Sequence, residues 1–502
     1  MFAASAFESP ESVEFEAFQN RQEIRMTRFE TVRTLYVSGC EDDRISNLQT
    51  VLLMTLWDCS SDDGPSASKY ISIAKAILES IEMAPTESET RMMKENPAFW
   101  KRLQWCVYIR DRLTALTLQC PYQIDESKFN VPMLKAADLQ IGPLSTKSCL
   151  GTNGSHPAIR DPSMRALLSQ IPIHLALFCK WATPILSSQS IGAQSIQHWM
   201  YLRTGLEVLL RDSELKEWQN TLPKALKWIH SSPLTGINKH GDVVLFFRAM
   251  LNGLYHLACH GLHKSRVDMV DPGLPELADL SKQQMRSSIS EMTEIYRFFR
   301  SKSFVYELPD VQVAMLETCI ASNLSDFSSP IPFIRQSAIE AFQLCAQGLQ
   351  QMSDTYPSAS KALATVNARI IARADKNKNK ELEDPQIEWQ GPHIGKYRGH
   401  HSPVTDWLDK TGMTTSQQID RFDITETSAL LTSHFMMTSS ERNFLQDLSS
   451  PETASPDSAA EVFVNSQEPK DGVWTSKSTS PDWKDSVLWS LYPAYGLGGL
   501  ID

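Results

Sequence analysis

Three histidines have a spacing at which one face of a helix could hold a metal ion. His256, His260 and His263 are four and then three residues apart, so their imidazoles would share a helix face. Imidazole nitrogen is a common zinc ligand, and helical H-E-x-x-H sites use the same i, i+4 pair. The glutamate of such sites is absent here, because Leu257 and Ala258 follow the first histidine. A metal-dependent helical enzyme is therefore one hypothesis, and histidines that only pack within a helical domain are the other.

Other motifs for catalysis or nucleotide binding are missing. The chain has no G-x-S-x-G turn for a nucleophilic serine. Residues 391–396 read Gly-Pro-His-Ile-Gly-Lys, one residue short of the phosphate-binding loop, and Tyr397 stands where a Ser or Thr would bind magnesium. The nine cysteines contain no C-x-x-C pair, which favours buried reduced thiols over a cysteine-based zinc site. We predict no catalytic residue and no cofactor.

The composition is typical of a soluble globular protein. The chain has 502 residues, 42% of them hydrophobic, which is enough to build a large core. Its formal net charge is −11, so a compact domain would repel phosphate unless basic side chains gather locally. The first residues are acidic and do not resemble a signal peptide, and no apolar run approaches the length of a membrane span. We expect no membrane partner.

Apolar residues recur at helical spacing through most of the chain up to residue 375. In residues 66–83, for example, Tyr70, Ala74, Ile77 and Ile81 fall on one face. Residues 98–118 are apolar around almost the whole circumference, which is typical of a buried helix. Alternating strand patterns are rare. We therefore predict an all-α fold with one large multi-helix domain, whose helices occupy residues 45–58, 66–83, 98–118, 162–185, 197–215, 242–263, 281–299, 311–324, 334–352 and 358–374.

Composition divides the chain into four predicted regions: a flexible segment at 1–29, the helical domain at 30–375, a linker with short ordered pieces at 376–437, and a tail at 438–502. The tail is rich in Ser, Thr, Pro and Asp and is predicted to be disordered. Aromatic residues are interleaved there with acidic ones, a composition that resembles activation domains. A plain disordered tail is the alternative. The aromatic residues of this possible activation tract are Trp474, Trp483, Trp489 and Tyr492.

A charged step interrupts the apolar helix at 98–118. Arg110, Asp111 and Arg112 lie in its second half, where an unpaired charge would be costly. We interpret the step as an internal ion pair or helix cap that fixes neighbouring helices. A direct contact with an effector is the alternative interpretation.

This helix and the loop after it also carry a family resemblance. Trp105 is followed by the step at 110–112, then by Pro121, and then by Val131 and Pro132. This order resembles the middle homology region of fungal zinc-cluster transcription factors, and most closely the group of the cutinase transcription factor. The best-matching part is residues 45–140.

Three departures from the family pattern are visible. The family's Gly-Arg-Pro turn is Gln119-Cys120-Pro121 here, and its Gly-Leu-His-Arg is Ser80-Ile81-Glu82-Met83. Both indicate a diverged member. The family's amino-terminal zinc cluster, with its six cysteines, is also absent before Arg21, so the zinc of the family is not expected in this chain. We expect either a truncated gene model or a regulator without that module.

The resemblance implies a nuclear regulator of RNA polymerase II transcription, acting on a metabolic or secondary-metabolite gene set, and not an enzyme. It implies the transcription machinery or another transcription factor as partners, and pairing into a homo- or heterodimer. DNA binding stays open because the cysteine cluster is absent. The alternatives are a co-regulator that has lost DNA binding and pairs with another factor through helices, and the metal-dependent enzyme considered above.

Overall fold

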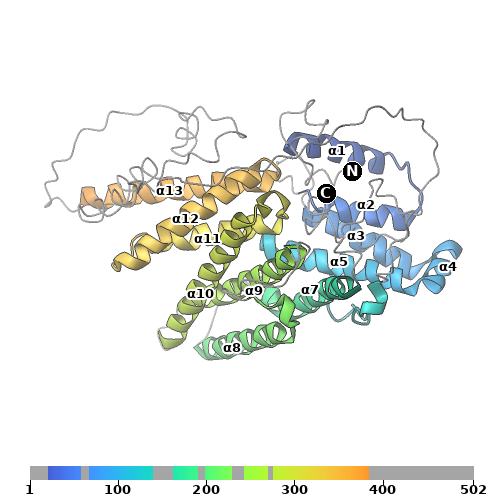
Figure 1. Ribbon diagram of the computed structural model, residues 1–502, viewed down its shortest axis with the longest axis horizontal. Coiled ribbons are helices and arrows are strands. Elements are labelled where there is room, and N and C mark those ends of the chain that lie inside the picture. Colours follow the sequence, from blue (N-terminus) through green and yellow to red (C-terminus); the bar gives the residue numbers. More distant parts are fainter. Residues whose placement is uncertain are drawn as a thin grey trace, which may run out of the picture. The chain divides into compact units, whose positions relative to one another are not determined.

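The computed structural model describes residues 21–57, 67–139, 162–189, 198–228, 242–268 and 275–383. These residues form helices and contain no strand, so the predicted all-α fold is confirmed (Figure 1). The predicted tail, including its four aromatic residues, lies outside them. The α-helices are α1 (Arg21–Val37), α2 (Arg44–Met54), α3 (Ala67–Met83), α4 (Glu87–Glu95), α5 (Pro97–Leu118), α7 (Pro162–Gln189), α8 (His198–Thr221), α9 (Asp242–Asp268), α10 (Pro275–Ser301), α11 (Val311–Asp326), α12 (Pro332–Ser353) and α13 (Pro357–Glu383), with short 3-10 helices η3 (Ala136–Leu139), η4 (Lys224–Leu226) and η5 (Phe304–Glu307).

Two compact units divide the described residues. The first runs to Val366 and contains helices α1 to α12 with the first turns of α13, and the second begins at Asn367. Helix α13 continues to Glu383, beyond the predicted domain end at residue 375, because the Lys and Glu residues of the polar run are good helix formers. Among the described helices, none combines the length and the apolar composition that crossing a membrane requires.

The amino-terminal boundary also differs from the sequence prediction. Residues 21–29, which the sequence predicts to be flexible, form the first turns of α1, and Ile24, Arg25 and Phe29 are buried there. Periodicity alone did not indicate this helix, because its buried side chains contact residues far along the chain. One of them, Arg25, donates to the carbonyl of Thr355.

Local side chains set several helix ends. The Asp43 carboxylate accepts the backbone N–H groups of Ile45 and Ser46 and so caps α2. Thr86 and Glu89 form a reciprocal capping box at the start of α4, a helix that we did not predict. Helix α2 ends at Met54, short of the predicted residue 58, and the residues that follow bind side chains from other helices.

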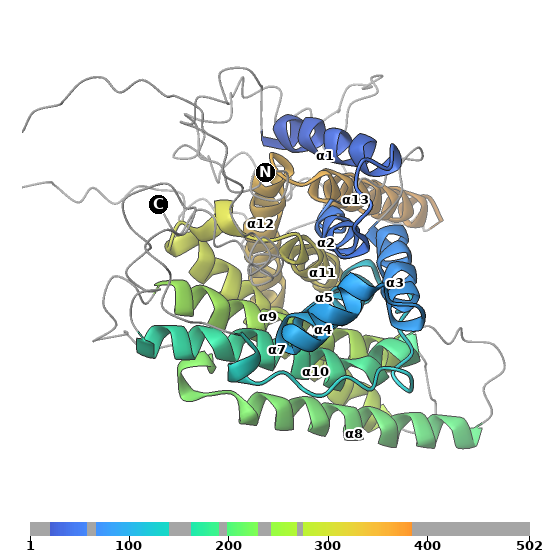
Figure 2. The ribbon, with the colours of Figure 1, turned by 90° about the vertical axis from the view of Figure 1, so that its right-hand side faces the viewer.

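Helix α5 is enclosed by other helices of the first unit. It contacts α2, α3, α4, α7 and α11, and Figures 1 and 2 both show it between α3 and α7. Leu103, Tyr108 and Ile109 point in different directions from the helix axis, yet all three are fully buried. This enclosure explains why the helix is apolar on all sides.

Helices α10, α11 and α12 pack closely around a glycine. A Cβ atom added at Gly348 of α12 would lie 2.5 Å from Cζ of Tyr296 and 2.9 Å from Cδ1 of Leu316. No larger residue fits there without moving the neighbouring helices. The glycine therefore sets how closely α12 approaches α10 and α11.

Candidate functional site: the charged step of α5 and its loop

The predicted charged step lies in the buried second half of α5. The helix begins with Pro97, and the side chain of Asn96 accepts the N–H of Phe99. It ends at Gln119, which adopts the left-handed conformation with φ 50° and ψ 41°. The family pattern has glycine at this position, and glycine takes this conformation without a steric cost. With Gln119 in place of glycine, the chain therefore keeps the turn but with backbone strain at this residue.

Asp111 binds the loop that follows α5. Its carboxylate accepts the backbone N–H groups of Gln123 and Ile124, each at 2.9 Å. It also forms an ion pair with Arg112, and the two side chains are 2% and 1% exposed. Burial raises the pKa of the Asp111 carboxyl, while the N–H donors and the guanidinium oppose that rise. The aspartate thus accepts hydrogen bonds from two backbone N–H groups of the loop. Without it, these groups would be buried with no acceptor in place of water.

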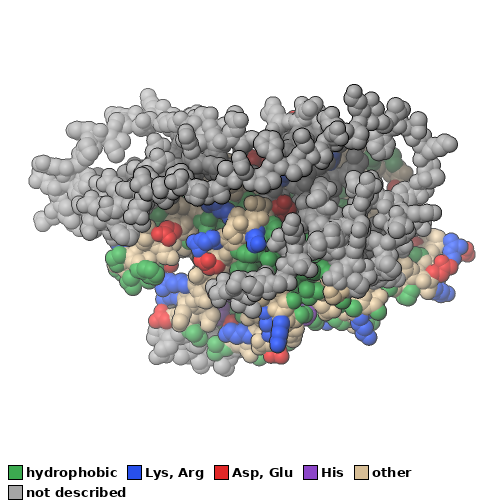
Figure 3. All heavy atoms as spheres, in the orientation of Figure 1, with side chains coloured by type: hydrophobic (Ala, Val, Ile, Leu, Met, Phe, Trp, Pro, Cys, Tyr) green, Lys and Arg blue, Asp and Glu red, His purple; other side chains and the backbone are tan. Residues whose placement is uncertain are grey.

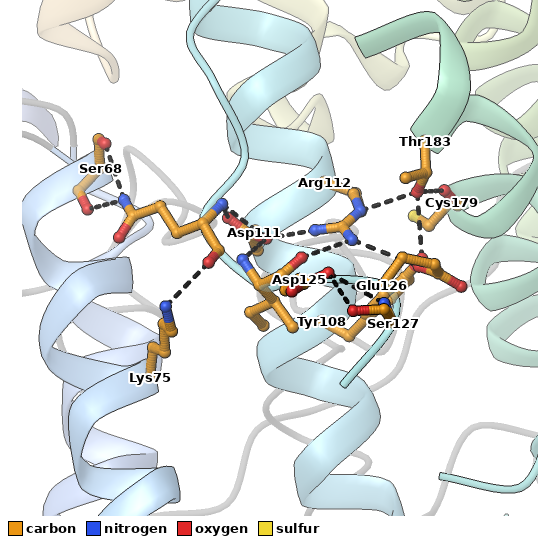
Figure 4. A network of polar contacts seen from close by, with 12 residues as sticks. Ser68, Lys75, Tyr108, Asp111, Arg112, Asp125, Glu126, Ser127, Cys179 and Thr183 are labelled. Carbon is orange, nitrogen blue, oxygen red and sulfur yellow. Dashed lines mark hydrogen bonds and ion pairs between the residues drawn. The ribbon is translucent and has the colours of Figure 1, made fainter. Parts of the chain in front are cut away.

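Arg112 extends this attachment to α7. Its Nε donates to Oγ1 of Thr183 at 2.8 Å, and its Nη2 donates to the carbonyl of Ile124 at 2.9 Å. The guanidinium carbon lies 4.3 Å from the ring centre of Tyr108 and 4.0 Å from that of Tyr122. One buried cation therefore joins α5, the loop and α7 (Figure 4).

A second set of contacts surrounds Glu126 on the same side. The Tyr108 hydroxyl donates to its carboxylate, and the Arg112 and Lys180 nitrogens lie 3.4 and 3.5 Å from it. Burial raises the pKa of the Tyr108 hydroxyl, so it is neutral and can donate at neutral pH. Glu126 is half-exposed, so this is the point where the buried network reaches solvent.

Gln123 connects the loop to α3. Its side-chain nitrogen donates to the carbonyl of Ser68 at 2.7 Å, and its side-chain oxygen accepts from the Ser72 hydroxyl at 2.6 Å. Lys75 donates to the Gln123 backbone carbonyl at 3.0 Å. In Figure 4, Ser68 and Lys75 lie on one side of Asp111, and Thr183 lies on the other side, beyond Arg112. The loop is therefore tied to α3 on one side and to α7 on the other.

Arg110 points away from this network and binds the end of α2. Its Nε donates to Oγ1 of Thr55 and its Nη2 to the Thr55 carbonyl, both at 2.9 Å. Its Nη2 lies 3.5 Å from the carboxylate of Asp310, the residue before α11. The three charged residues of the step thus serve two separate attachments.

Of the remaining family-motif residues, Trp105 lies on α5, and Pro121, Val131 and Pro132 lie on the loop. The Trp105 indole donates to the carbonyl of Pro132 at 3.0 Å and meets the ring of Phe129 edge to face. Val131 is half-buried, and Pro121 is exposed just after the left-handed turn. These residues hold the loop against α5 and offer no group for acid–base or nucleophilic chemistry.

The three histidines of α9 have separate environments. His260 contacts the Ser322 hydroxyl through Nε2 at 2.9 Å, whereas His263 lies 3.5 Å from the Asp212 carboxylate and 3.4 Å from the Ser281 hydroxyl. His256 meets the ring of Tyr255. Within the described ranges, no group of three or more His, Cys, Asp or Glu side chains is arranged to hold a metal ion.

Sequence reasoning missed most of the partners in this network. Thr55, Gln123, Glu126, Thr183 and Asp310 were not among the predicted site residues. Gln123 and Glu126 lie within the loop of the family motif, which is the one signal that could have indicated them. The other three have no such signal, because only the fold brings them to α5.

Charge on the surface is mixed. On the face drawn in Figure 3, acidic and basic side chains of the described residues are interspersed. The described side chains visible there do not form a broad basic patch of the kind that binds a nucleic-acid backbone.

Comparison with known proteins identifies the segment that contains this network. Residues 2–230 match the family model of the fungal specific transcription factor domain. This part of the chain is therefore similar to a fungal specific transcription factor domain. The family resemblance predicted from the sequence is confirmed.

Three proteins that are similar to this chain are named transcription factors. Cutinase transcription factor 1 beta of Fusarium vanettenii is 24% identical over 389 residues, which cover 74% of this chain and 44% of that protein. Transcription factor cpaR of Aspergillus oryzae is 25% identical over 385 residues, covering 73% and 63%. Cutinase transcription factor 1 alpha of Fusarium vanettenii is 22% identical over 386 residues, covering 74% and 38%. The chain thus spans less than two thirds of the length of each, and no solved structure matches it.

Proposed function

We propose that this chain regulates RNA polymerase II transcription in the nucleus and is not an enzyme. The match of residues 2–230 to the fungal specific transcription factor domain carries the proposal. The names of the relatives support it, because all those given above are transcription factors. The polar network around α5 agrees with a regulatory role, since its charged groups bind backbone and other helices.

In this proposal the helical domain is a scaffold that holds the factor in a defined arrangement. Asp111 and Arg112 fix the loop after α5 between α3 and α7, and Arg110 fixes the end of α2 near α11. The regulated genes belong to a metabolic or secondary-metabolite set, by analogy with relatives named for cutinase. The partners are the transcription machinery or a second transcription factor, which pairs through helices.

A reporter assay tests the regulatory role. The full chain is fused to a heterologous DNA-binding domain and expressed in a fungal strain whose reporter carries the matching sites. We expect the fusion to raise reporter output about tenfold over the DNA-binding domain alone, because the acidic and aromatic tract supplies an activation surface. The unfused chain is the control. Unchanged output from a fusion that is present in the nucleus would contradict the proposal.

A second candidate is a co-regulator that does not bind DNA itself. The net charge of −11 and the interspersed surface charges favour this candidate. A gel-shift experiment with the purified chain and promoter fragments of genes that respond to its deletion separates the two. Submicromolar binding by the chain alone would exclude the co-regulator, whereas binding that appears only with a second factor would support it.

A further inference from the structure

Five segments that are distant in the sequence meet at the end of α2. They are the start of α1, residues 55–57 after α2, Arg110 of α5, residues 308–310 before α11 and residues 354–356 after α12. At the far side of this junction, the Tyr356 hydroxyl donates to the carbonyl of Leu308 at 2.9 Å, so the segments beside α11 and α12 are joined to each other.

Arg25 is the link from α1 to this junction. Its Nη1 donates to the Thr355 carbonyl at 2.8 Å, and its Nη2 donates to the Leu56 carbonyl at 3.3 Å. The guanidinium carbon lies 5.3 Å from the ring centre of Trp57 and 4.7 Å from that of Tyr356. Its side chain therefore binds backbone from two segments and the aromatic rings of the same two segments.

The fully buried side chains of helix α1 lie in its first half. Its buried residues are Arg21, Ile24, Arg25 and Phe29, and none of them lies in the last two turns. Leu35 is 53% and Val37 is 76% exposed near its end. A helix of this length has little stability of its own, so its structure depends on packing against the rest of the unit.

The attached half covers an aromatic surface. The Phe29 ring stacks on Trp57 at 5.6 Å and meets Tyr70 edge to face at 6.0 Å. Trp57, Tyr70 and Tyr356 are 2%, 3% and 6% exposed with α1 in place. Each of the three rings therefore lies against Phe29 or Arg25 of α1.

We propose that α1 is a latch whose docking is coupled through Arg25 to the end of α12. When residues 354–356 move, Arg25 loses the Thr355 carbonyl and the Tyr356 ring together, and α1 opens to expose the aromatic surface. Opening of α1 likewise loosens residues 354–356. The coupling goes beyond the regulatory role and holds whether or not the chain regulates transcription.

Hydrogen exchange on the purified full chain, read by mass spectrometry, tests this coupling. In Arg25→Met, which keeps an apolar stem but removes the donors, we expect exchange about tenfold faster both in α1 and in residues 354–359. In Tyr356→Leu, which removes the ring beside Arg25 and the hydrogen bond to Leu308, we expect a similar increase in α1. Residues 245–262 of α9 should keep their protection in both variants.

The matched control is Arg33→Met on the same helix, because Arg33 is 41% exposed and pairs with Glu30 within one turn. It should leave residues 354–359 unchanged. Wild-type exchange of α1 in Tyr356→Leu, or of residues 354–359 in Arg25→Met, would refute the coupling. Equal acceleration in α9 would refute a local latch, because the whole unit would then be opening.

Discussion

Asp111 and Arg112 are neighbours in the sequence and also partners in an ion pair, with side chains only 2% and 1% exposed. Consecutive helical residues usually point in different directions, so this pairing requires both side chains to bend toward the loop after α5. The loop supplies the further donors and acceptors that make the burial of two charges tolerable.

Removing the charge of Asp111 should therefore be costly. Asp111→Asn puts an amide where two N–H groups and a guanidinium now donate, and leaves the buried Arg112 with only the more distant, half-exposed Glu126 as a counter-charge. We expect the free energy of unfolding to fall by about 3–5 kcal/mol. Urea unfolding measures it, with Asp125→Asn as the control, because Asp125 binds only the nearby Ser127 at an exposed turn. If Asp111→Asn lowered the free energy of unfolding by less than Asp125→Asn does, the pair of Asp111 and Arg112 would not be what holds the loop.

Glycine substitutions test the packing of α12. Gly348→Ala forces a Cβ atom against the Tyr296 ring and should destabilise the protein by about 2–3 kcal/mol. Gly253→Ala is the matched variant, because its nearest neighbour is the flexible side chain of Met315, whose sulfur lies at 2.9 Å. The gain of about 1 kcal/mol in helix propensity should offset most of that contact. Thermal unfolding of both variants measures this difference. Equal decreases in their midpoint temperatures would contradict the tight packing at Gly348.

The left-handed residue at the end of α5 gives a prediction of the opposite sign. Gln119→Gly should raise the free energy of unfolding by about 1 kcal/mol, because glycine adopts a φ of 50° without strain. Gln119→Ala keeps the strain and should give no gain. Denaturant midpoints of the three proteins provide the measurement, and equal stabilisation by both substitutions would rule out backbone strain as the cause.

His260 should make stability depend on pH. Burial, with smaller contributions from Lys264 and His263, lowers the pKa of its imidazole from 6.5 to about 4. The unfolded chain therefore takes up a proton below pH 6.5 that the folded protein does not take up until about pH 4. Stability should fall by about 3 kcal/mol across that window and be unaffected above it.

The matched variants for this prediction are His260→Gln and His256→Gln. Replacing the buried histidine should flatten the slope of unfolding free energy against pH between 4 and 6.5. Replacing the partly exposed His256 should leave the slope as it is. An unchanged slope in His260→Gln would mean that other groups cause the acid sensitivity.

The sequence predicted the elements of this fold better than the connections between them. Apolar spacing placed α3, α5 and α9 within a few residues, since the pattern is local. Helix α4 was missed because its polar sequence buries one side chain, Glu89, whose partner Arg44 lies on α2. Residues 21–29 were missed for the same reason, since the groups that bury Arg25 are supplied by distant segments.

The charged step shows the same limit at the level of single residues. Its position in an apolar helix favoured an internal ion pair, and Asp111 and Arg112 form one. Nothing in the sequence indicated that Arg110 would leave this pair for Thr55 and Asp310. The partner of a buried charged side chain depends on how the helices pack against one another. That packing is a property of the assembled fold.

The junction at the end of α2 has a consequence for how the protein can be divided. Residues 2–230 match the family model, yet Arg25 and Arg110 inside that segment bind Thr355 and lie beside Asp310 outside it. An expressed fragment that stops at residue 230 would lose these partners and would expose the surfaces of α5 and α7 that α11 and α9 now cover, and aggregation would be its expected fate. Fragments for crystallisation should therefore extend through Val366, the end of the first unit.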